Sequence, residues 1–137
     1  MLHLYVQVSS DEARCMSGPS GDKILVTGAL GQIGTELVEA LRKQHGSSAV
    51  IASDLRPVEQ VDLSQGPYLT LDVLDTEAII DVCKKEGVGT VYHLAALLSA
   101  TGEKNPELCR EVNVGGSISV FEAARMCSMR VFTPSSI

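Results

Sequence analysis

The chain has 137 residues, of which 45% are hydrophobic and 20% charged, and its formal net charge is −6. This length and composition favour a single globular domain and exclude an intrinsically disordered protein. The acidic balance argues against nucleic-acid binding, because no basic patch exists to replace phosphate counterions, and no apolar run reaches the roughly 18 residues that span a bilayer. We expect a soluble protein that binds neither nucleic acid nor membrane.

The first 22 residues differ in character from the rest. Polar and turn-forming residues gather at 9–12 and 17–21, and the short apolar start lacks the basic and long apolar regions of a signal peptide. We predict a disordered N-terminal tail over residues 1–22 and a folded domain over 23–137. The four cysteines are widely spaced without a C-x-x-C pair. That pattern is typical of reduced thiols, so we expect an intracellular protein, cytoplasmic or mitochondrial, without a metal site.

Apolar strands alternate with helices after this tail. The first strand is expected at 24–27, and a helix over Gln32–His45 follows it and ends at Gly46. Ile33, Leu37 and Leu41 recur every four residues and form the predicted inward stripe of that helix. Further strands are expected at 49–52, 68–71, 90–94 and 130–133.

Two later helices carry clear start signals. Asp75 is predicted to cap a helix that ends near Gly87, and Asn105, followed by proline, to cap one that continues to about Cys127. Apolar strands alternating with helices indicate an α/β fold, a Rossmann-type doubly wound parallel sheet with strand order 3-2-1-4-5, truncated after the fifth strand. The fifth strand would then be an uncovered edge of the sheet.

Three glycines spaced three apart, Gly28, Gly31 and Gly34, follow the first strand. In a strand–turn–helix unit the first permits the turn, the second lets the backbone approach phosphates, and the third lets the helix pack closely. The helix N-terminus that follows carries unpaired N–H groups and a positive dipole end, where a pyrophosphate can bind. The spacing therefore predicts a dinucleotide site that includes Gln32 and Ile33.

Asp54 ends the second expected strand. A carboxylate about 20 residues beyond the glycines accepts hydrogen bonds from the ribose hydroxyls and repels a 2′-phosphate. The position of Asp54 therefore predicts NAD rather than NADP as the cofactor, and the nearby Arg56 is interpreted as a solvated side chain.

The G-x-x-G-x-x-G spacing after Thr27 resembles the extended, epimerase-like branch of the short-chain dehydrogenase/reductase superfamily. The pair at 72–73, the segment at 93–96 and the helix sequence at 111–125 resemble the corresponding motifs of that family. The resemblance implies that Asp72 and Val73 hold the adenine and that Leu94, Ala95 and Ala96 leave room for the cofactor. It also implies that Asn113 is a polar bridge beside the catalytic strand. His93 we expect to be a packed, neutral side chain.

The segments 31–34, 50–54, 66–67, 95–106 and 134–137 resemble more specifically the short-chain type of L-threonine 3-dehydrogenase. This resemblance implies hydride transfer from Cβ of L-threonine to NAD, giving 2-amino-3-ketobutyrate. It implies that Ser136 holds the substrate hydroxyl beside Ser135, and that Ser99 helps to place the amino-acid head group. It also implies a possible homodimer, formed through helices that include the one after Asn105.

The Y-x-x-x-K motif that supplies the general base in this family does not occur in the chain. Because a general base contributes on the order of 10²–10⁴-fold to the rate, we predict that the 137-residue chain alone has no L-threonine dehydrogenase activity. Two alternatives remain open. The chain could be part of a nucleotide-sugar epimerase or dehydratase, or a truncated NAD-binding paralogue without enzymatic activity.

Overall fold

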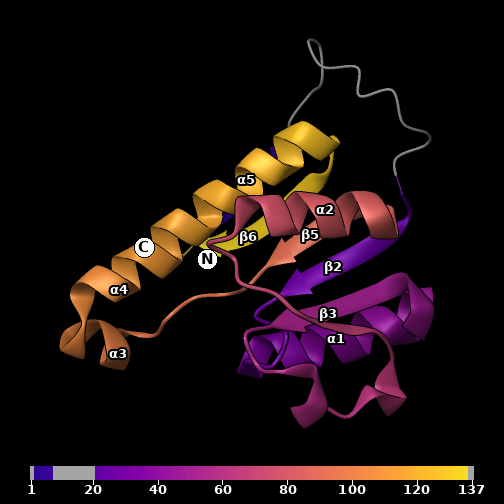
Figure 1. Cartoon of the computed structure of the whole chain (residues 1–137), viewed down its shortest axis with the longest axis horizontal. Helices are drawn as coiled ribbons and strands as arrows, with labels where there is room; N and C mark the ends of the chain where they lie inside the picture. The colour runs from indigo at the N-terminus through magenta and orange to yellow at the C-terminus, as the bar shows by residue number, and fades with distance from the viewer. Residues whose placement is uncertain (1, 8–20, 136–137) are drawn as a thin grey trace.

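The computed structural model describes residues 2–7 and 21–135 (Figure 1). Over these residues the strands form one six-stranded sheet in the order β1-β6-β5-β2-β3-β4. The parallel strands are β2 (Lys23–Thr27), β3 (Val50–Asp54), β4 (Tyr68–Thr70), β5 (Val88–His93) and β6 (Arg130–Ser135). Counted along the chain, these five strands have the order 3-2-1-4-5, so the predicted doubly wound topology is confirmed.

The strand β1 (Leu2–Gln7) differs from the sequence prediction. It pairs antiparallel with β6, from Leu2 opposite Ser135 to Gln7 opposite Arg130. Residues 2–7, expected in a disordered tail, are therefore a sheet strand, and the edge of β6 is covered rather than open. The remainder of the expected tail, residues 8–20, lies outside the described residues.

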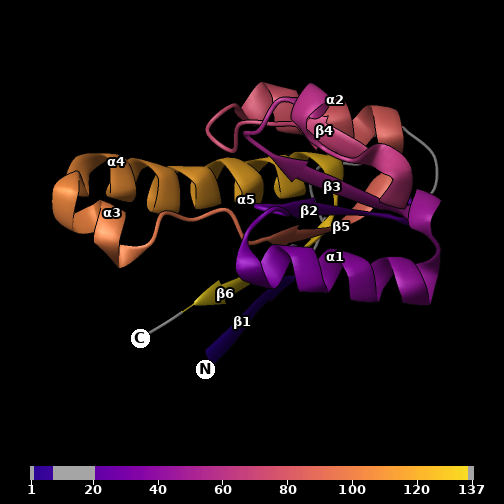
Figure 2. The same cartoon turned by 90° about the horizontal axis from the view of Figure 1, so that it is seen from below.

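Helices cover both faces of the sheet (Figure 2). Helix α1 (Gln32–His45) lies on one face, and α2 (Thr76–Glu86) and α5 (Gly116–Cys127) lie side by side on the other. The inward residues of α1 are Gly34, Val38 and Leu41. The predicted stripe was wrong at Ile33, which is 61% exposed, because a strict four-residue repeat drifts around a helix of 3.6 residues per turn.

The helix ends follow local capping chemistry. The Asp75 carboxylate accepts a hydrogen bond from the Ala78 N–H at 2.9 Å, and Gly87 ends α2 in the left-handed region with φ 70°. The Asn105 side chain accepts from the Leu108 N–H at 3.1 Å at the start of α4 (Pro106–Arg110). Both predicted caps are confirmed.

The helix expected from Asn105 to about Cys127 is interrupted. A π-helical turn at Glu111–Gly115 joins α4 to α5, and a short helix α3 (Ser99–Lys104) precedes them. Single π turns often mark functional positions in helices. Here the turn contains Asn113, one of the predicted site residues.

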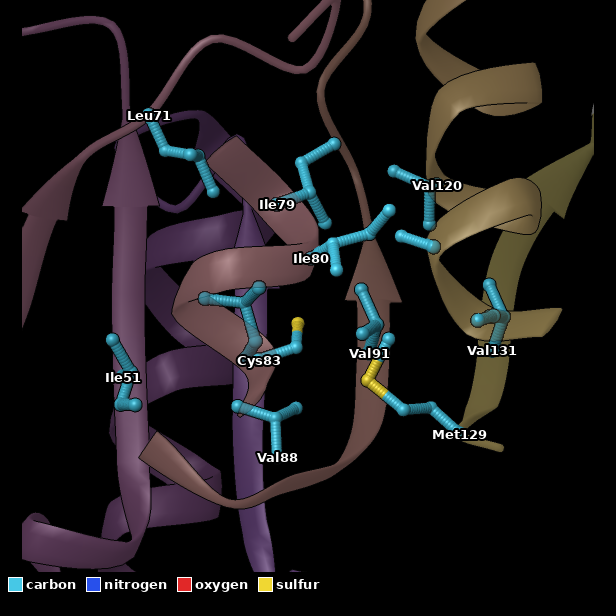
Figure 3. Close-up of a cluster of buried hydrophobic side chains, with 13 residues drawn as sticks. Ile51, Leu71, Ile79, Ile80, Cys83, Val88, Val91, Val120, Met129 and Val131 are labelled. Atoms are coloured by element: carbon cyan, nitrogen blue, oxygen red, sulfur yellow. The ribbon is translucent and has the colours of Figure 1, made fainter. Parts of the chain in front are cut away.

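Buried side chains fill both faces of the sheet. Figure 3 shows the core between the sheet and helices α2 and α5, where Ile79 and Ile80 point toward Val120 and Met129 lies beside Val91. Under α1 the core comprises Ile24, Val26, Ala29, Val38, Leu41, Val50, Ala52 and Tyr68. The strands are apolar on both faces because helices cover both faces, as parallel sheets require.

Candidate functional site

A cleft of about 190 Å³ lies beside the carboxyl ends of the parallel strands, where the chain leaves β2, β3 and β5. Strand β2 lies between β3 and β5, so the strand order reverses here and leaves the crevice in which open α/β sheets bind ligands. The structure brings eight of the predicted cofactor residues together around this cleft: Gly28, Gly31, Asp54, Asp72, Val73, Leu94, Ala95 and Ala96. Leu55, Leu71, Leu97 and Val112 complete its lining and were not predicted.

The glycine loop is shaped by close backbone contacts. Gly28 has φ 68°, and a Cβ there would lie 2.7 Å from Cα of Ala95. A Cβ on Gly34 would collide with the carbonyl oxygen of Gly28, so α1 could not pack this close to the loop with any other residue. Gly28 and Gly34 are therefore required by the fold itself.

Gly31 is different, because the space beside it is open. Among the described residues, a Cβ at Gly31 would meet within 4 Å only the Gly28 carbonyl oxygen, at 3.4 Å. Gly31 is also the N-cap of α1, where no side chain from the described region caps the helix and no acidic residue occupies the first turn. The first N–H groups of a helix need acceptors, so this position fits an anionic group such as a pyrophosphate.

The carboxylate of Asp54 is held at the end of β3 by two backbone donors. One oxygen accepts from the Leu30 N–H at 3.1 Å, and the other accepts from the Leu55 N–H at 2.8 Å. Each carboxylate oxygen can accept a further hydrogen bond, so Asp54 fits the two hydroxyls of a ribose. Burial, and secondly the negative charge of Asp54, raises the pKa of Tyr68.

Asp72 and Val73 also line the cleft. The Asp72 carboxylate accepts from the Leu74 N–H at 2.9 Å, which fixes the turn before α2. Val73 is buried, and it lies so close to the start of α5 that a Cβ on Gly116 would be 2.8 Å from Cγ2 of Val73. This contact explains why a glycine stands inside a helix, where it is otherwise unfavourable.

His93 is 3% exposed, and its Nδ1 lies 2.8 Å from the Thr27 hydroxyl oxygen. Burial lowers the pKa of His93 from its ordinary value of 6.5 to about 4, so the ring is neutral at physiological pH. This agrees with the expectation that His93 is packed and neutral.

Asn113 does not line the cleft but fixes the segment that does. Its side-chain oxygen accepts from the Leu97 N–H at 2.7 Å, and its side-chain nitrogen donates to the Leu97 carbonyl at 3.0 Å. The same nitrogen donates to Sγ of Cys109 at 3.4 Å. The bridge is therefore direct and joins the π turn to the loop after β5, a pairing for which the sequence offers no signal.

The other predicted residues lie outside the cleft lining. Gln32 and Ile33 stand in the exposed first turn of α1. Ser99 begins α3 and Ser135 is the last residue of β6. Ser136 lies outside the described residues.

A larger cavity of about 630 Å³ lies between α1 and the segment 61–68. The Arg42 guanidinium in its wall donates to the Pro67 carbonyl at 2.6 Å and to the Val50 carbonyl at 3.3 Å. Its charge is therefore used to hold the connection between β3 and β4. We assign the site to the smaller cleft, which has the glycine loop and the two carboxylates.

Within the described ranges 2–7 and 21–135, no helix is long and apolar enough to span a membrane. The same residues contain no group of three or more His, Cys, Asp and Glu side chains arranged to hold a metal ion.

Comparison with known proteins extends this picture. A model of the NAD dependent epimerase/dehydratase family matches residues 24–137. An uncharacterized epimerase/dehydratase of Staphylococcus haemolyticus is 46% identical over 117 residues, which are 85% of this chain and 37% of that protein. The chain thus spans little more than a third of the length of this relative.

Solved structures of L-threonine dehydrogenases are also similar. The enzyme of Clostridium difficile has a TM-score of 0.78 and 42% identity, over 86% of this chain and 37% of its own. A monomeric L-threonine 3-dehydrogenase from a metagenome database has a TM-score of 0.73 and 45% identity, over 79% of this chain and 34% of its own.

Proposed function

The chain belongs to the NAD dependent epimerase/dehydratase family, and we propose that residues 23–137 are the NAD-binding domain of an oxidoreductase resembling L-threonine 3-dehydrogenase. The observation that carries the proposal is the open space beside Gly31, in a cleft that Asp54 and Ala95 also line. A dinucleotide has an anionic pyrophosphate that fits the space beside Gly31 and a ribose that fits the Asp54 carboxylate.

In the proposed complex each part of the cofactor has its own protein group. Gly31 and the first turn of α1, which includes Gln32 and Ile33, hold the pyrophosphate, and Asp54 holds the adenosine ribose. Asp72 and Val73 receive the adenine, and the small side chains of Ala95 and Ala96 leave room for the rest of the dinucleotide. Bound NAD supplies a hydride acceptor, and the negative charge of Asp54 disfavours the 2′-phosphate of NADP.

The proposed reaction of the whole protein is the oxidation of L-threonine at Cβ to 2-amino-3-ketobutyrate. The 42% and 45% identities to two L-threonine dehydrogenases support this substrate. Ser136 would hold the substrate hydroxyl with Ser135 beside it, and Ser99 would place the head group. Because the 137 residues contain no Y-x-x-x-K motif, we propose that this stretch of chain binds NAD without turning over L-threonine.

A homodimer is also part of the proposal. Val114 and Ile118 are four residues apart on the helix after Asn105 and are 52% and 62% exposed. Two large apolar side chains on one helix face suit a helix-to-helix contact between copies. A molar mass measured by light scattering, with Ile118→Glu as the disrupting variant, tests this part separately.

We further propose an intracellular location, cytoplasmic or mitochondrial, which the free thiols of Cys83 and Cys109 support.

The experiment that tests the proposed reaction starts from the transcript. Sequencing it past the Ile137 codon shows whether an open frame continues to a Y-x-x-x-K motif. The product of such a frame is then assayed for NADH formation with L-threonine and, separately, for epimerisation of a UDP-sugar. NADH formed only with L-threonine supports the proposal, and turnover of the UDP-sugar supports the epimerase alternative. NADH formation from L-threonine by the purified 137-residue chain would contradict the proposal that this stretch binds NAD without turnover.

A further inference from the structure

The edge of β6 carries a strand that the rest of the topology does not require. Of the described strands, β1 alone runs antiparallel to its neighbour, and it pairs with β6 over the whole length of both. An unpaired strand at this edge would present a row of N–H and C=O groups, to which another chain can add. The pairing of β1 removes that row from solvent.

The position of β1 in the sheet is also the position of a further strand in the complete doubly wound fold. In the order 3-2-1-4-5-6, the sixth strand adds beside the fifth, which here is β6. A strand has only two edges, and the other edge of β6 pairs with β5. A sixth strand and β1 therefore cannot occupy the β6 edge in the same molecule.

The chain connection allows β1 to reach this edge within one molecule. Gln7 lies opposite Arg130, at the amino end of β6, and β2 starts at Lys23, opposite Val88 at the amino end of β5. Three strand spacings, about 15 Å, separate β1 from β2. Residues 8–20 can extend to about 40 Å, so the connection does not force β1 to pair with another copy.

The sequence of β1 suits an edge strand. Leu2, Leu4 and Val6 alternate with His3, Tyr5 and Gln7, which is the period of a strand with two different faces.

We propose that Leu2–Gln7 is a displaceable edge strand. It covers the β6 edge within its own molecule and leaves that edge whenever a further strand of the same protein is added there. The partner that fits the β6 edge is thus a single extended segment, supplied in cis.

A cysteine cross-link tests the pairing directly. Leu4 and Thr133 are opposite one another in the register, so the variant Leu4→Cys/Thr133→Cys should form a disulfide under oxidised glutathione. The matched control Leu4→Cys/Val131→Cys is out of register by two residues. We expect the first link within a single molecule, identified by peptide mapping and by monomer mobility on a non-reducing gel. Absence of that link, equal yield in the control, or a link between two molecules would overturn the proposal.

A second measurement tests whether β1 protects the backbone of β6. Leu4→Pro/Val6→Pro removes two N–H groups from β1, and Leu4→Thr/Val6→Thr keeps both and serves as the control. In the proline variant we expect amide exchange to increase at least tenfold in β6 while β2 and β3 stay protected. Unchanged exchange in β6 would refute the pairing of β1 with it.

Discussion

Gly115 and Gly116 offer a sharp test of how the cleft wall is built, because the two neighbouring residues face different surroundings. A methyl group on Gly116 would lie 2.8 Å from Cγ2 of Val73, whereas one on Gly115 would lie 3.3 Å from Cδ2 of Leu74. Carbon atoms in contact normally lie about 3.5–4.0 Å apart. Val73 is buried and β-branched, so it rotates with difficulty, while the end of Leu74 can move aside.

The magnitudes follow from two opposing effects. Alanine in place of glycine stabilises a helix by about 1 kcal/mol. Forcing extra atoms into a packed core costs about 1–3 kcal/mol. We expect Gly116→Ala to lower the free energy of unfolding by about 1 kcal/mol and Gly115→Ala to raise it by a few tenths. Because Val73→Ala removes the clash, the pair Gly116→Ala/Val73→Ala should show a favourable coupling of about 1–2 kcal/mol.

Urea unfolding followed by circular dichroism measures these differences in a double-mutant cycle. NAD titration of the folded variants adds a second reading, since Val73 lines the cleft. The reasoning is refuted if Gly115→Ala and Gly116→Ala have equal effects, or if the cycle shows no coupling between Gly116 and Val73.

Three further predictions concern single residues of the site. Asp54→Asn should weaken NAD binding about tenfold and reduce the preference for NAD over NADP, because a charged hydrogen-bond acceptor is lost. Unchanged NAD affinity in calorimetry would count against the assignment of Asp54 to the ribose. Asn113→Leu should lower the free energy of unfolding, measured in urea, by about 1–3 kcal/mol, because the backbone N–H and C=O of Leu97 both lose their side-chain partner. Asn113→Asp, which keeps only the acceptor, should have a stability between those of the unaltered chain and Asn113→Leu. Equal stability of all three forms would exclude the bridge. The pKa of His93 falls from 6.5 to about 4 on folding, so the free energy of unfolding is at its full value above pH 6.5 and decreases by about 3 kcal/mol as the pH falls toward 4. His93→Gln should flatten this part of the curve of unfolding free energy against pH. An unaltered curve would show that His93 does not cause the decrease.

Local signals account for most of the fold that the sequence predicted. The caps at Asp75 and Asn105, the glycine ends of α1 and α2, and the apolar strands each depend on a few adjacent residues. The strand order followed because right-handed crossovers and the glycine loop leave few topologies.

Features set by distant parts of the chain were not predicted. The strand β1 is stabilised by β6, more than 120 residues away in the sequence, so its own short apolar run was interpreted as part of a tail. The π turn at Glu111–Gly115 interrupts the helix expected after Asn105, and the side chain of Asn113 within it bonds to the backbone of Leu97, in a separate segment. Tertiary contacts of this kind leave no periodic pattern in the sequence.

In the candidate site, too, features set by adjacent residues were predicted and features set by distant segments were not. The glycine spacing and the strand-end carboxylates are motifs, and the structure brings them to one cleft. The additional lining residues Leu55, Leu71, Leu97 and Val112 were not assigned to the cofactor by any motif, although Leu97 and Val112 lie within segments that resemble the family. The direct bond from Asn113 to the Leu97 backbone becomes visible only when the helix and the loop are placed together.

The central claim, that the cleft beside the glycine loop binds NAD, is tested most directly by calorimetric titration of the 137-residue chain and its Gly31→Val variant. Gly31 has φ −73°, which any residue adopts, and the space beside it is open, so valine should leave the free energy of unfolding nearly unchanged while filling the place of the pyrophosphate. The account predicts saturable one-to-one binding of NAD, weaker binding of NADP, and no detectable binding by the folded variant. NAD binding by Gly31→Val with the affinity of the unaltered chain, or no binding by the unaltered chain, would contradict it.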